Sequence, residues 1–487
     1  MRKFAIALTL LVTMWATGPA LNSTPLPLLP DGQIAQAAAS ISGAIRFQKA
    51  YGGNSNEGKV PFGIARQPIA VAGPLADGGF LLVGSTESFG AGNGDMYAIR
   101  INAQGDVQWS RTYGGSAADY AFDVAGPLAD GGFLLVGSTR SFGAGNGDIY
   151  AVRINDQGGV VWSKTYGRLP QDDAFAVAGP LSDGGFLLVG KTGIGLDWDM
   201  YAVRIDAQGG HQWSKAYGGD KEEEALAVAG PLADGGFLLA GKTSSFGQSV
   251  DAYAVRIDGQ GNVQWSKNYG GGQYDDAKAI AWADDGFLLV GDTSSFELGT
   301  IAYAVRMDSQ GNVQWSRTYQ GAYGGDTYAI VGPLADGGFL LVGAAYYGSG
   351  AGENQMYAAR INAQGGFQWG RAYGGNRDDK AFAVAGPSGD GSFLLLGYTE
   401  SFGAGGVDLY AVRMDGTAGT SGCHETTLTA QVRTPATQVG APATQTTSLT
   451  PTVTTPATQT TTPATQMTTL CSVASGFFLY LPLVCRN

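Results

Sequence analysis

Acidic side chains are the residues of this sequence whose type and spacing could do chemistry. They recur in short clusters, and the candidate ligand-binding residues among them are Asp119, Asp172, Asp173, Glu223, Asp275, Asp276, Asp326, Asp378 and Asp379. Crowded carboxylates attract cations, amines and basic surfaces, and they raise one another's pKa values, as general acid catalysis or glycoside hydrolysis needs. The same carboxylates could instead cap loops by accepting backbone N–H hydrogen bonds. The sequence leaves both interpretations open and identifies no catalytic residue.

The other residue types give fewer indications of a binding or catalytic site. The chain of 487 residues has only 2 His and 3 Cys, and its formal net charge is −12. The two histidines, His211 and His424, form no catalytic constellation, and the cysteines lack the spacing of a zinc site or a disulfide framework. The acidic balance argues against a nucleic-acid partner, which needs a basic footprint. We therefore expect no cofactor, and the sequence leaves open whether a metal ion is bound.

The acidic clusters belong to a unit that repeats from residue 44 to residue 415. A Gly-Phe-Leu-Leu-Val-Gly run or a close variant recurs every 50 to 54 residues, with its Phe at Phe80, Phe133, Phe186, Phe237, Phe287, Phe339 and Phe393. In the second unit, residues 121–125, 133–136, 148–154 and 160–166 have the apolar runs or the alternation of β-strands. Four short strands in a unit of about 50 residues are typical of a β-propeller.

The ends of the repeat region indicate a closed ring. The last unit, residues 381–415, lacks a fourth strand, and a copy of that strand, Ile45–Tyr51, stands before the first unit. Pairing of Ile45–Tyr51 with Leu409–Met414 would complete a seventh blade and remove two exposed sheet edges. The sequence therefore predicts an all-β fold: a seven-bladed β-propeller with four antiparallel strands per blade, closed by pairing of the N-terminal strand with the last blade.

The unit resembles a known family, the bacterial seven-bladed β-propeller repeat. The matching stretches are Gly261–Gly271 (Gly-Asn-Val-Gln-Trp-Ser-Lys-Asn-Tyr-Gly-Gly), the acidic pair Asp275-Asp276, Gly291–Ser294 and Asp251–Tyr253. The Gly-Pro-Leu-Ala-Asp-Gly-Gly turn departs from that pattern and is consistent with a neighbouring subfamily. The resemblance implies the propeller fold and an extracytoplasmic location, and it implies no reaction.

The connections between strands divide into two sets. In a propeller, the turns between the first and second strands and between the third and fourth strands share one face. Here these turns are nearly uniform, as Gly-Pro-Leu-Ala-Asp-Gly-Gly and (Asn/Asp)-x-Gln-Gly. The loops on the other face vary from unit to unit and carry the acidic clusters. Because function on a rigid scaffold is usually carried by variable loops, we expect a ligand to bind on the variable-loop face.

The two ends of the chain differ from the repeat region. Residues 1–20 have the charged start and short apolar core of a secretory signal peptide, with cleavage possible as late as residue 39, and 21–43 is a linker. Residues 416–470 are rich in Thr, Pro, Ala and Gln and are predicted to form a disordered stalk. Residues 471–487 form a short apolar tail, too short to span a bilayer.

These features together predict an exported monomer that is secreted or held at the cell surface. The expected function is non-catalytic binding or adhesion, with a glycan or a protein as ligand on the variable-loop face. Two alternatives stay open at this point: a carbohydrate-active enzyme that uses the rim carboxylates, and a structural component of the cell envelope. No transmembrane span is expected in the mature protein, and no nucleic acid is expected to bind.

Overall fold

The structure covers most of the repeat region and short stretches after it. The computed structural model describes residues 45–58, 67–144, 146–168, 170–195, 197–283, 285–297, 299–321, 325–346, 354–416, 425–428, 430–440, 445–448, 452–454, 459–461 and 466–472. The predicted signal peptide, the linker over 21–43, Cys423, His424 and the tail after Ser472 lie outside the described residues. Every regular element in the described residues is a β-strand, so none of them supplies a helix able to cross a bilayer.

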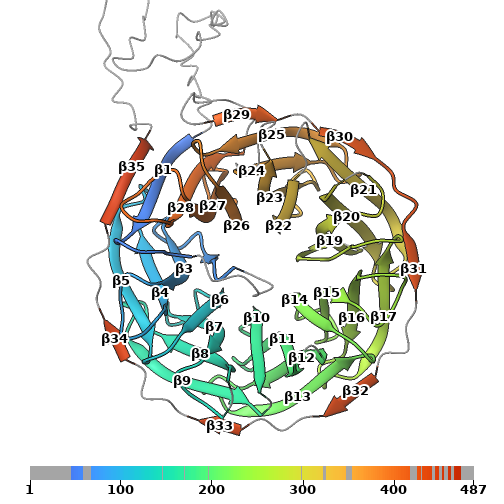
Figure 1. The fold of residues 1–487 in the computed structure, drawn as a ribbon, viewed down its shortest axis with the longest axis horizontal. Coiled ribbons are helices and arrows are strands. Elements are labelled where there is room, and N and C mark those ends of the chain that lie inside the picture. The colour runs from blue at the N-terminus through green and yellow to red at the C-terminus, as the bar shows by residue number, and fades with distance from the viewer. Residues whose placement is uncertain are drawn as a thin grey trace, which may run out of the picture.

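Seven antiparallel sheets stand around one axis, as Figure 1 shows, and the strands of blades 1 to 6 run outward in chain order. Blades 1 to 3 are β2 (Ala70–Ala72), β3 (Phe80–Thr86), β4 (Asp95–Ile101) and β5 (Val107–Gly114); β6 (Asp119–Ala125), β7 (Phe133–Thr139), β8 (Asp148–Ile154) and β9 (Val160–Gly167); and β10 (Gln171–Ala178), β11 (Phe186–Ile194), β12 (Asp197–Ile205) and β13 (His211–Gly218).

Blades 4 to 6 are β14 (Glu223–Ala229), β15 (Phe237–Thr243), β16 (Asp251–Ile257) and β17 (Val263–Gly270); β18 (Ala279–Ala283), β19 (Gly286–Thr293), β20 (Ile301–Asp308) and β21 (Val313–Gly321); and β22 (Gly325–Val331), β23 (Phe339–Tyr346), β24 (Asn354–Ile361) and β25 (Phe367–Tyr373). Blade 7 is β26 (Asp379–Ala385), β27 (Ser392–Thr399) and β28 (Asp408–Asp415), with β1 (Ile45–Gly52) as its fourth strand. The predicted all-β, seven-bladed fold is confirmed.

The N-terminal strand closes the ring. Strand β1 pairs antiparallel with β28, with Tyr51 opposite Leu409 and Ala50 opposite Tyr410. The Tyr51 hydroxyl also donates a hydrogen bond of 2.7 Å to the Gly105 carbonyl in blade 1. The strand therefore completes blade 7 and also holds it against blade 1.

The same tyrosine contact recurs from blade to blade. Each outermost strand of the four ends in Tyr-Gly or a variant of it, and the Tyr hydroxyl donates to a turn carbonyl of the next blade, as Tyr217 does to Gly261 at 2.9 Å. The equivalent hydroxyl of Tyr373 is placed against the Met414 sulfur at 3.2 Å. Both side chains are fully buried.

The contact between Tyr217 and Gly261 gives a test of the interblade hydrogen bond. We expect Tyr217→Phe to lower the free energy of unfolding by about 1–2 kcal/mol, because it leaves the buried Gly261 carbonyl without its donor. Chemical denaturation of this variant beside the native chain measures the loss, and an unchanged free energy of unfolding would show that the carbonyl bond does not hold the blades together.

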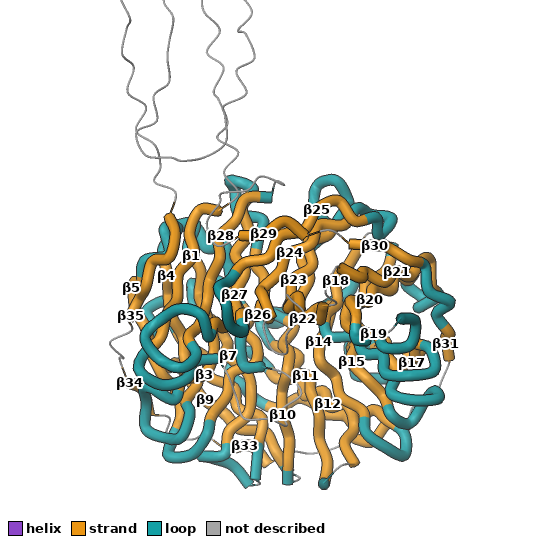
Figure 2. Tube along the Cα trace, turned by 45° about the horizontal axis from the view of Figure 1, so that its top comes forward, coloured by secondary structure: helices purple, strands orange, loops and turns teal. Residues whose placement is uncertain are grey.

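The uniform turns have a structural role in every blade. The Asp of the turn between the first two strands lies at the surface, and an Arg of the third strand forms an ion pair with it. The seven pairs are Arg100–Asp77, Arg153–Asp130, Arg204–Asp183, Arg256–Asp234, Arg306–Asp285, Arg360–Asp336 and Arg413–Asp390. Figure 2 shows loops at both ends of the strands. This repeated pair explains why one set of turns stays constant in sequence.

The predicted disordered stalk is where the structure differs from the sequence analysis. The described residues of 425–472, here called the C-terminal belt, add a fifth, outermost strand to each blade (Figure 1). The belt strands are β29 (Glu425–Leu428), β30 (Ala430–Arg433), β31 (Gln438–Gly440), β32 (Gln445–Ser448), β33 (Thr452–Thr454), β34 (Gln459–Thr461) and β35 (Gln466–Ser472). They lie in turn on blades 6, 5, 4, 3, 2, 1 and 7.

The reason for this difference is that a segment with nothing to bury can still form strands at a sheet edge. Each blade without the belt presents a row of unpaired backbone N–H and C=O groups along its outer strand. The belt pairs with these groups, for example Tyr217 with Thr446 and Tyr113 with Thr460. Its order therefore comes from backbone hydrogen bonds to the ring, which its composition alone does not reveal.

Candidate functional site

The innermost strands carry an irregularity that aims side chains toward the ring axis. Their pairing with the second strand shifts register at one residue, a β-bulge, in blades 2, 3, 4, 6 and 7. The bulged residues are Phe122, Phe175, Leu226, Tyr328 and Phe382, and Lys278 occupies the same place in blade 5. Bulges re-aim side chains and are frequent beside functional sites. One lysine therefore stands among a set of apolar and aromatic residues.

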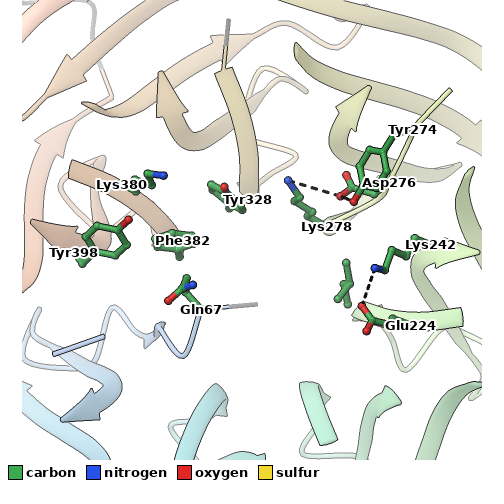
Figure 3. Close-up of a pocket in the computed structure, with 11 residues that line it drawn as sticks. Gln67, Glu224, Lys242, Tyr274, Asp276, Lys278, Tyr328, Lys380, Phe382 and Tyr398 are labelled. Atoms are coloured by element: carbon green, nitrogen blue, oxygen red, sulfur yellow. Dashed lines mark hydrogen bonds and ion pairs between the residues drawn. The ribbon is translucent and has the colours of Figure 1, made fainter. Parts of the chain in front are cut away.

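A pocket with a volume of about 330 Å³ lies among the innermost strands of blades 4 to 7. Its lining residues are Gln67, Glu224, Leu226, Lys242, Tyr274, Asp276, Lys278, Tyr328, Lys380, Phe382 and Tyr398. Figure 3 shows them facing one central space. Most of them lie at the start of an innermost strand or the end of a second strand, next to the variable loops. The pocket therefore opens at the face that the sequence favoured for binding.

One wall of the pocket is a row of aromatic rings from blades 6 and 7. The ring centroids of Tyr328 and Phe382 are 4.6 Å apart, and those of Phe382 and Tyr398 are 5.6 Å apart with the rings stacked. Burial raises the pKa of Tyr328 above its ordinary value, so its hydroxyl stays protonated and donates to Asp326 Oδ2 at 3.0 Å. The row is a flat, uncharged surface whose polar atoms are held at its edge.

The opposite wall consists of ion pairs from blades 3 and 4. Glu224 Oε1 lies 2.9 Å from Lys191 Nζ, and Glu224 Oε2 lies 3.4 Å from Lys242 Nζ. Lys242 also contacts Glu222 at 3.0 Å. These groups are held in fixed positions by one another, so this wall presents preformed polar contacts to a ligand.

Lys278 lies between the two walls. Its Nζ is 3.7 Å from Asp276 Oδ2, pairs with Asp292, and lies 4.5 Å from the centroid of the Tyr328 ring. Burial alone would lower the pKa of Lys278, but the carboxylates of Asp276 and Asp292 hold it well above the usual range. Lys278 is therefore an ammonium group at neutral pH and contacts an aromatic face.

The candidate residues from the sequence separate into two sets, because neighbouring residues on a strand point to opposite sides. Asp173 and Asp276 directly follow Asp172 and Asp275, and Asp276 lines the pocket. Asp326, the second residue of β22, has the equivalent place in blade 6. Glu224, which the sequence analysis did not select, has this position in blade 4, while the selected Glu223 precedes it. Asp378 lies before β26 and accepts hydrogen bonds of 3.0 Å from the backbone N–H and the side chain of Asn354.

The other set has the capping role that the sequence left open. Each carboxylate accepts the backbone N–H of the residue four positions earlier, and most also accept a Thr or Ser hydroxyl. The set and its N–H donors are Asp119 with Gly115, Asp172 with Arg168, Glu223 with Gly219, Asp275 with Gly271 and Asp379 with Gly375; Glu57 with Gly53 is equivalent in blade 1. These side chains are buried at 0–1% relative exposure, so they hold the loops and do not face the pocket.

Four of these capping carboxylates face a second carboxylate across the boundary between blades. The pairs are Glu57 with Asp408, Asp119 with Asp95, Glu223 with Asp199 and Asp275 with Asp251. A Cβ placed on Gly52 would lie 1.8 Å from Asp408 Oδ1 and 2.4 Å from Glu57 Oε2. Only glycine leaves room for both groups, which explains why Gly follows the outer Tyr at these boundaries.

Burial and the neighbouring charge change the acidity of these pairs. Burial, with a further contribution from Asp408, raises the pKa of Glu57 to about 7. Burial and Asp119 raise the pKa of Asp95 to about 6, and burial and Asp275 do the same for Asp251. The described residues contain no cluster of three or more His, Cys, Asp or Glu that could hold a metal ion, and the pairs are two-carboxylate arrangements.

Most pocket residues were missed by the sequence analysis, and the missing signal is identifiable. Lys278, Lys380 and Phe382 stand one or three positions after a capping carboxylate. Lys242 and Tyr398 lie near the ends of the second strands β15 and β27. The replacement of Phe by Lys278 at the bulge position of blade 5 departs from the repeat. A comparison of the units position by position would have singled it out.

Comparison with known proteins identifies no family for this chain. No protein-family model matches the chain, and no curated protein matches its sequence. Among solved structures, the chain is similar to one described as the crystal structure of the polysaccharide lyase Uly1. That likeness has a TM-score of 0.38 and 11% identity, and it covers 77% of this chain and 98% of the other. At this level the likeness carries no argument about activity.

Proposed function

We propose that this protein is an exported binding module that holds an uncharged sugar unit of a glycan in the pocket at its variable-loop face. The observation that carries the proposal is the row Tyr328–Phe382–Tyr398 facing a wall of fixed ion pairs. Flat rings pack against the apolar face of a sugar, and fixed polar groups orient its hydroxyls. A volume of about 330 Å³ suits one or two sugar units and not the surface of a folded protein.

The charges around the pocket support an uncharged ligand. Glu224 lies against Lys191 and Lys242, and Asp276 lies near Lys278 and accepts the Tyr274 hydroxyl at 2.9 Å. These carboxylates are engaged by ammonium groups and by a tyrosine hydroxyl, so they serve as fixed polar contacts that can orient a ligand. The predicted export signal and the repeat's likeness to extracytoplasmic propellers agree with a glycan met outside the cytoplasm.

The bulge positions offer a matched pair of variants to test this function. Phe382 stacks in the pocket, while Phe122 has the same strand position across the ring and packs against Phe175, with centroids 5.3 Å apart. On a glycan array, we expect Phe382→Ala to weaken the best-bound glycan at least tenfold, since a buried stacking contact is lost. We expect Phe122→Ala to retain binding, although both variants lose core packing.

Two further outcomes would contradict the proposal. The exposed Trp282 lies on the opposite, uniform-turn face, at 41% relative exposure; if Trp282→Ala abolishes binding and Phe382→Ala does not, the ligand site is on the wrong face. If no glycan binds, the alternative of a structural envelope component is favoured. If a bound glycan is cleaved, the alternative of a carbohydrate-active enzyme is favoured.

A further inference from the structure

The C-terminal belt follows a repeat of seven residues. Its markers are Gln431, Gln438, Gln445, Thr452, Gln459 and Gln466, each seven positions after the previous one. Pro-Ala-Thr stands directly before Gln438, Gln445, Gln459 and Gln466. Seven residues of extended chain span at most about 25 Å. One heptad of the belt therefore corresponds to one step between neighbouring blades.

Every marker meets its blade at the same place. Each pairs with the residue that directly follows the outer Tyr: Gln431 with Gln320, Gln438 with Gly270, Gln445 with Gly218, Thr452 with Gly167, Gln459 with Gly114 and Gln466 with Gly52. The next residue of each heptad pairs with the Tyr itself, as Val439 does with Tyr269. The register is thus the same on six successive blades.

This constant register makes the heptads interchangeable. If the belt moved along the ring by one blade, each heptad would meet an outer strand in the register it left. Backbone pairing therefore selects a blade edge, without selecting a particular blade or a particular ring. Added strands of this kind gain their affinity from main-chain hydrogen bonds.

Side-chain contacts anchor the belt at blade 5. Arg433 forms an ion pair with Glu297 at 2.5 Å, Ser316 donates to the Pro435 carbonyl at 3.2 Å, and the hydroxyls of Tyr303 and Thr437 are 2.6 Å apart. Arg433 is more than half exposed, with a side-chain exposure of 54%. An exposed ion pair holds a segment weakly, because solvent screens it. The belt strands are short, so the belt can separate from its ring without opening the core.

We propose that the seven blade edges are docking sites for the belt heptads of a second copy of this chain, so that copies link by exchange of their belts. The occupant fits because its repeat length and its register match the edges on six blades. In dilute solution the protein's own belt occupies the blade edges, because the short connection after β28 gives it a high effective concentration. At high protein concentration, the belts of other copies compete for the same edges. Exchange of an identical segment is a low-cost route to association.

Cysteine cross-linking of the full chain tests this proposal, in a background with Cys423, Cys471 and Cys485 replaced by Ser. Lys215 of β13 and Ser448 of β32 are direct cross-strand partners. With Lys215→Cys and Ser448→Cys in one molecule, we expect an intramolecular disulfide. With the two substitutions on separate copies, we expect a disulfide-linked dimer whose yield rises with protein concentration and with brief warming.

The neighbouring belt position supplies the matched control. Thr447 directly precedes Ser448 and is paired in the ladder with Ala216, not with Lys215. We expect Thr447→Cys on one copy to form at least tenfold less dimer with Lys215→Cys on the other. The proposal is overturned if separate copies stay unlinked while the single-molecule pair forms its bond, or if Thr447→Cys links as readily as Ser448→Cys. Absence of the single-molecule bond would also overturn it, because the register would then be wrong.

Discussion

Deletion of residues 45–52 is expected to open the ring and leave a chain that aggregates. Strand β1 supplies the fourth strand of blade 7, and its buried Phe47 and Tyr51 pack in the core shared with blade 1. Without it, the outer edge of β28 is exposed and the bond from Tyr51 to Gly105 is lost. Removing two buried aromatic residues costs about 3–5 kcal/mol each, which approaches the whole stability of a domain.

Size-exclusion chromatography and thermal unfolding of the truncated chain measure this effect. Deletion of residues 466–472 is the matched control, because it removes β35, the strand on the other side of β1. The control should stay monomeric with a small fall in melting temperature, since β35 is outermost. A soluble and equally stable chain without residues 45–52 would refute closure by β1.

Raising the pH from about 5 to about 8 is expected to destabilise the ring. The folded-state pKa values of Glu57, Asp95 and Asp251 are about 7, 6 and 6, all raised above their unfolded values by burial and a facing carboxylate. A group with a raised folded pKa binds its proton more tightly in the native state, so its contribution is present at low pH and is lost as the pH rises through the folded pKa. Since one pKa unit is about 1.4 kcal/mol, the three sites together account for a loss on the order of 5 kcal/mol.

Denaturant unfolding across this pH range, with Asp95→Asn beside the native chain, measures the effect. The amide replaces the protonated carboxyl, so the variant should lose less stability between pH 5 and pH 8. Two boundaries of the ring already avoid the pair: Gln355 takes this place opposite Asp379, and Ile301 takes it opposite Gly325. Burial lowers the pKa of His211, which acts in the opposite direction as a single group. A native chain whose stability rises with pH would contradict the expectation.

The fold could be predicted because the sequence repeats. The recurrence of apolar runs such as Phe133–Val136 indicates the number of blades. The extra strand Ile45–Tyr51 before the first unit indicates how the ring closes. Because the same strand pattern occurs in every unit, a wrongly assigned strand in one unit does not change the predicted number of blades. Closure also needs only the pairing of two strands, Ile45–Tyr51 and Leu409–Met414, whose patterns are visible in the sequence.

The candidate site could be predicted only in part. The acidic clusters correctly indicated the starts of the innermost strands. Adjacent residues such as Glu223 and Glu224 point to opposite sides of a strand, however, and one sequence does not say which side faces the ring axis. The bulge at Leu226 also changes which side of the strand the following side chains face, so a strict alternation of inward and outward residues does not hold there. The belt escaped prediction because its strands depend on edges that exist only after the ring has formed, although its heptad step was visible in the sequence.

The positions of the two described ends restrict how the ring can be presented. Phe47 near the start of β1 pairs with Ser472 at the end of β35, so residues 1–44 and 473–487 leave from one spot on the circumference. An attachment made through either segment would therefore hold the disc by its perimeter. The axis of the ring would then run parallel to the supporting surface. Neither of the two faces of the ring would be covered by that surface, and a polymer could reach the ring from the side.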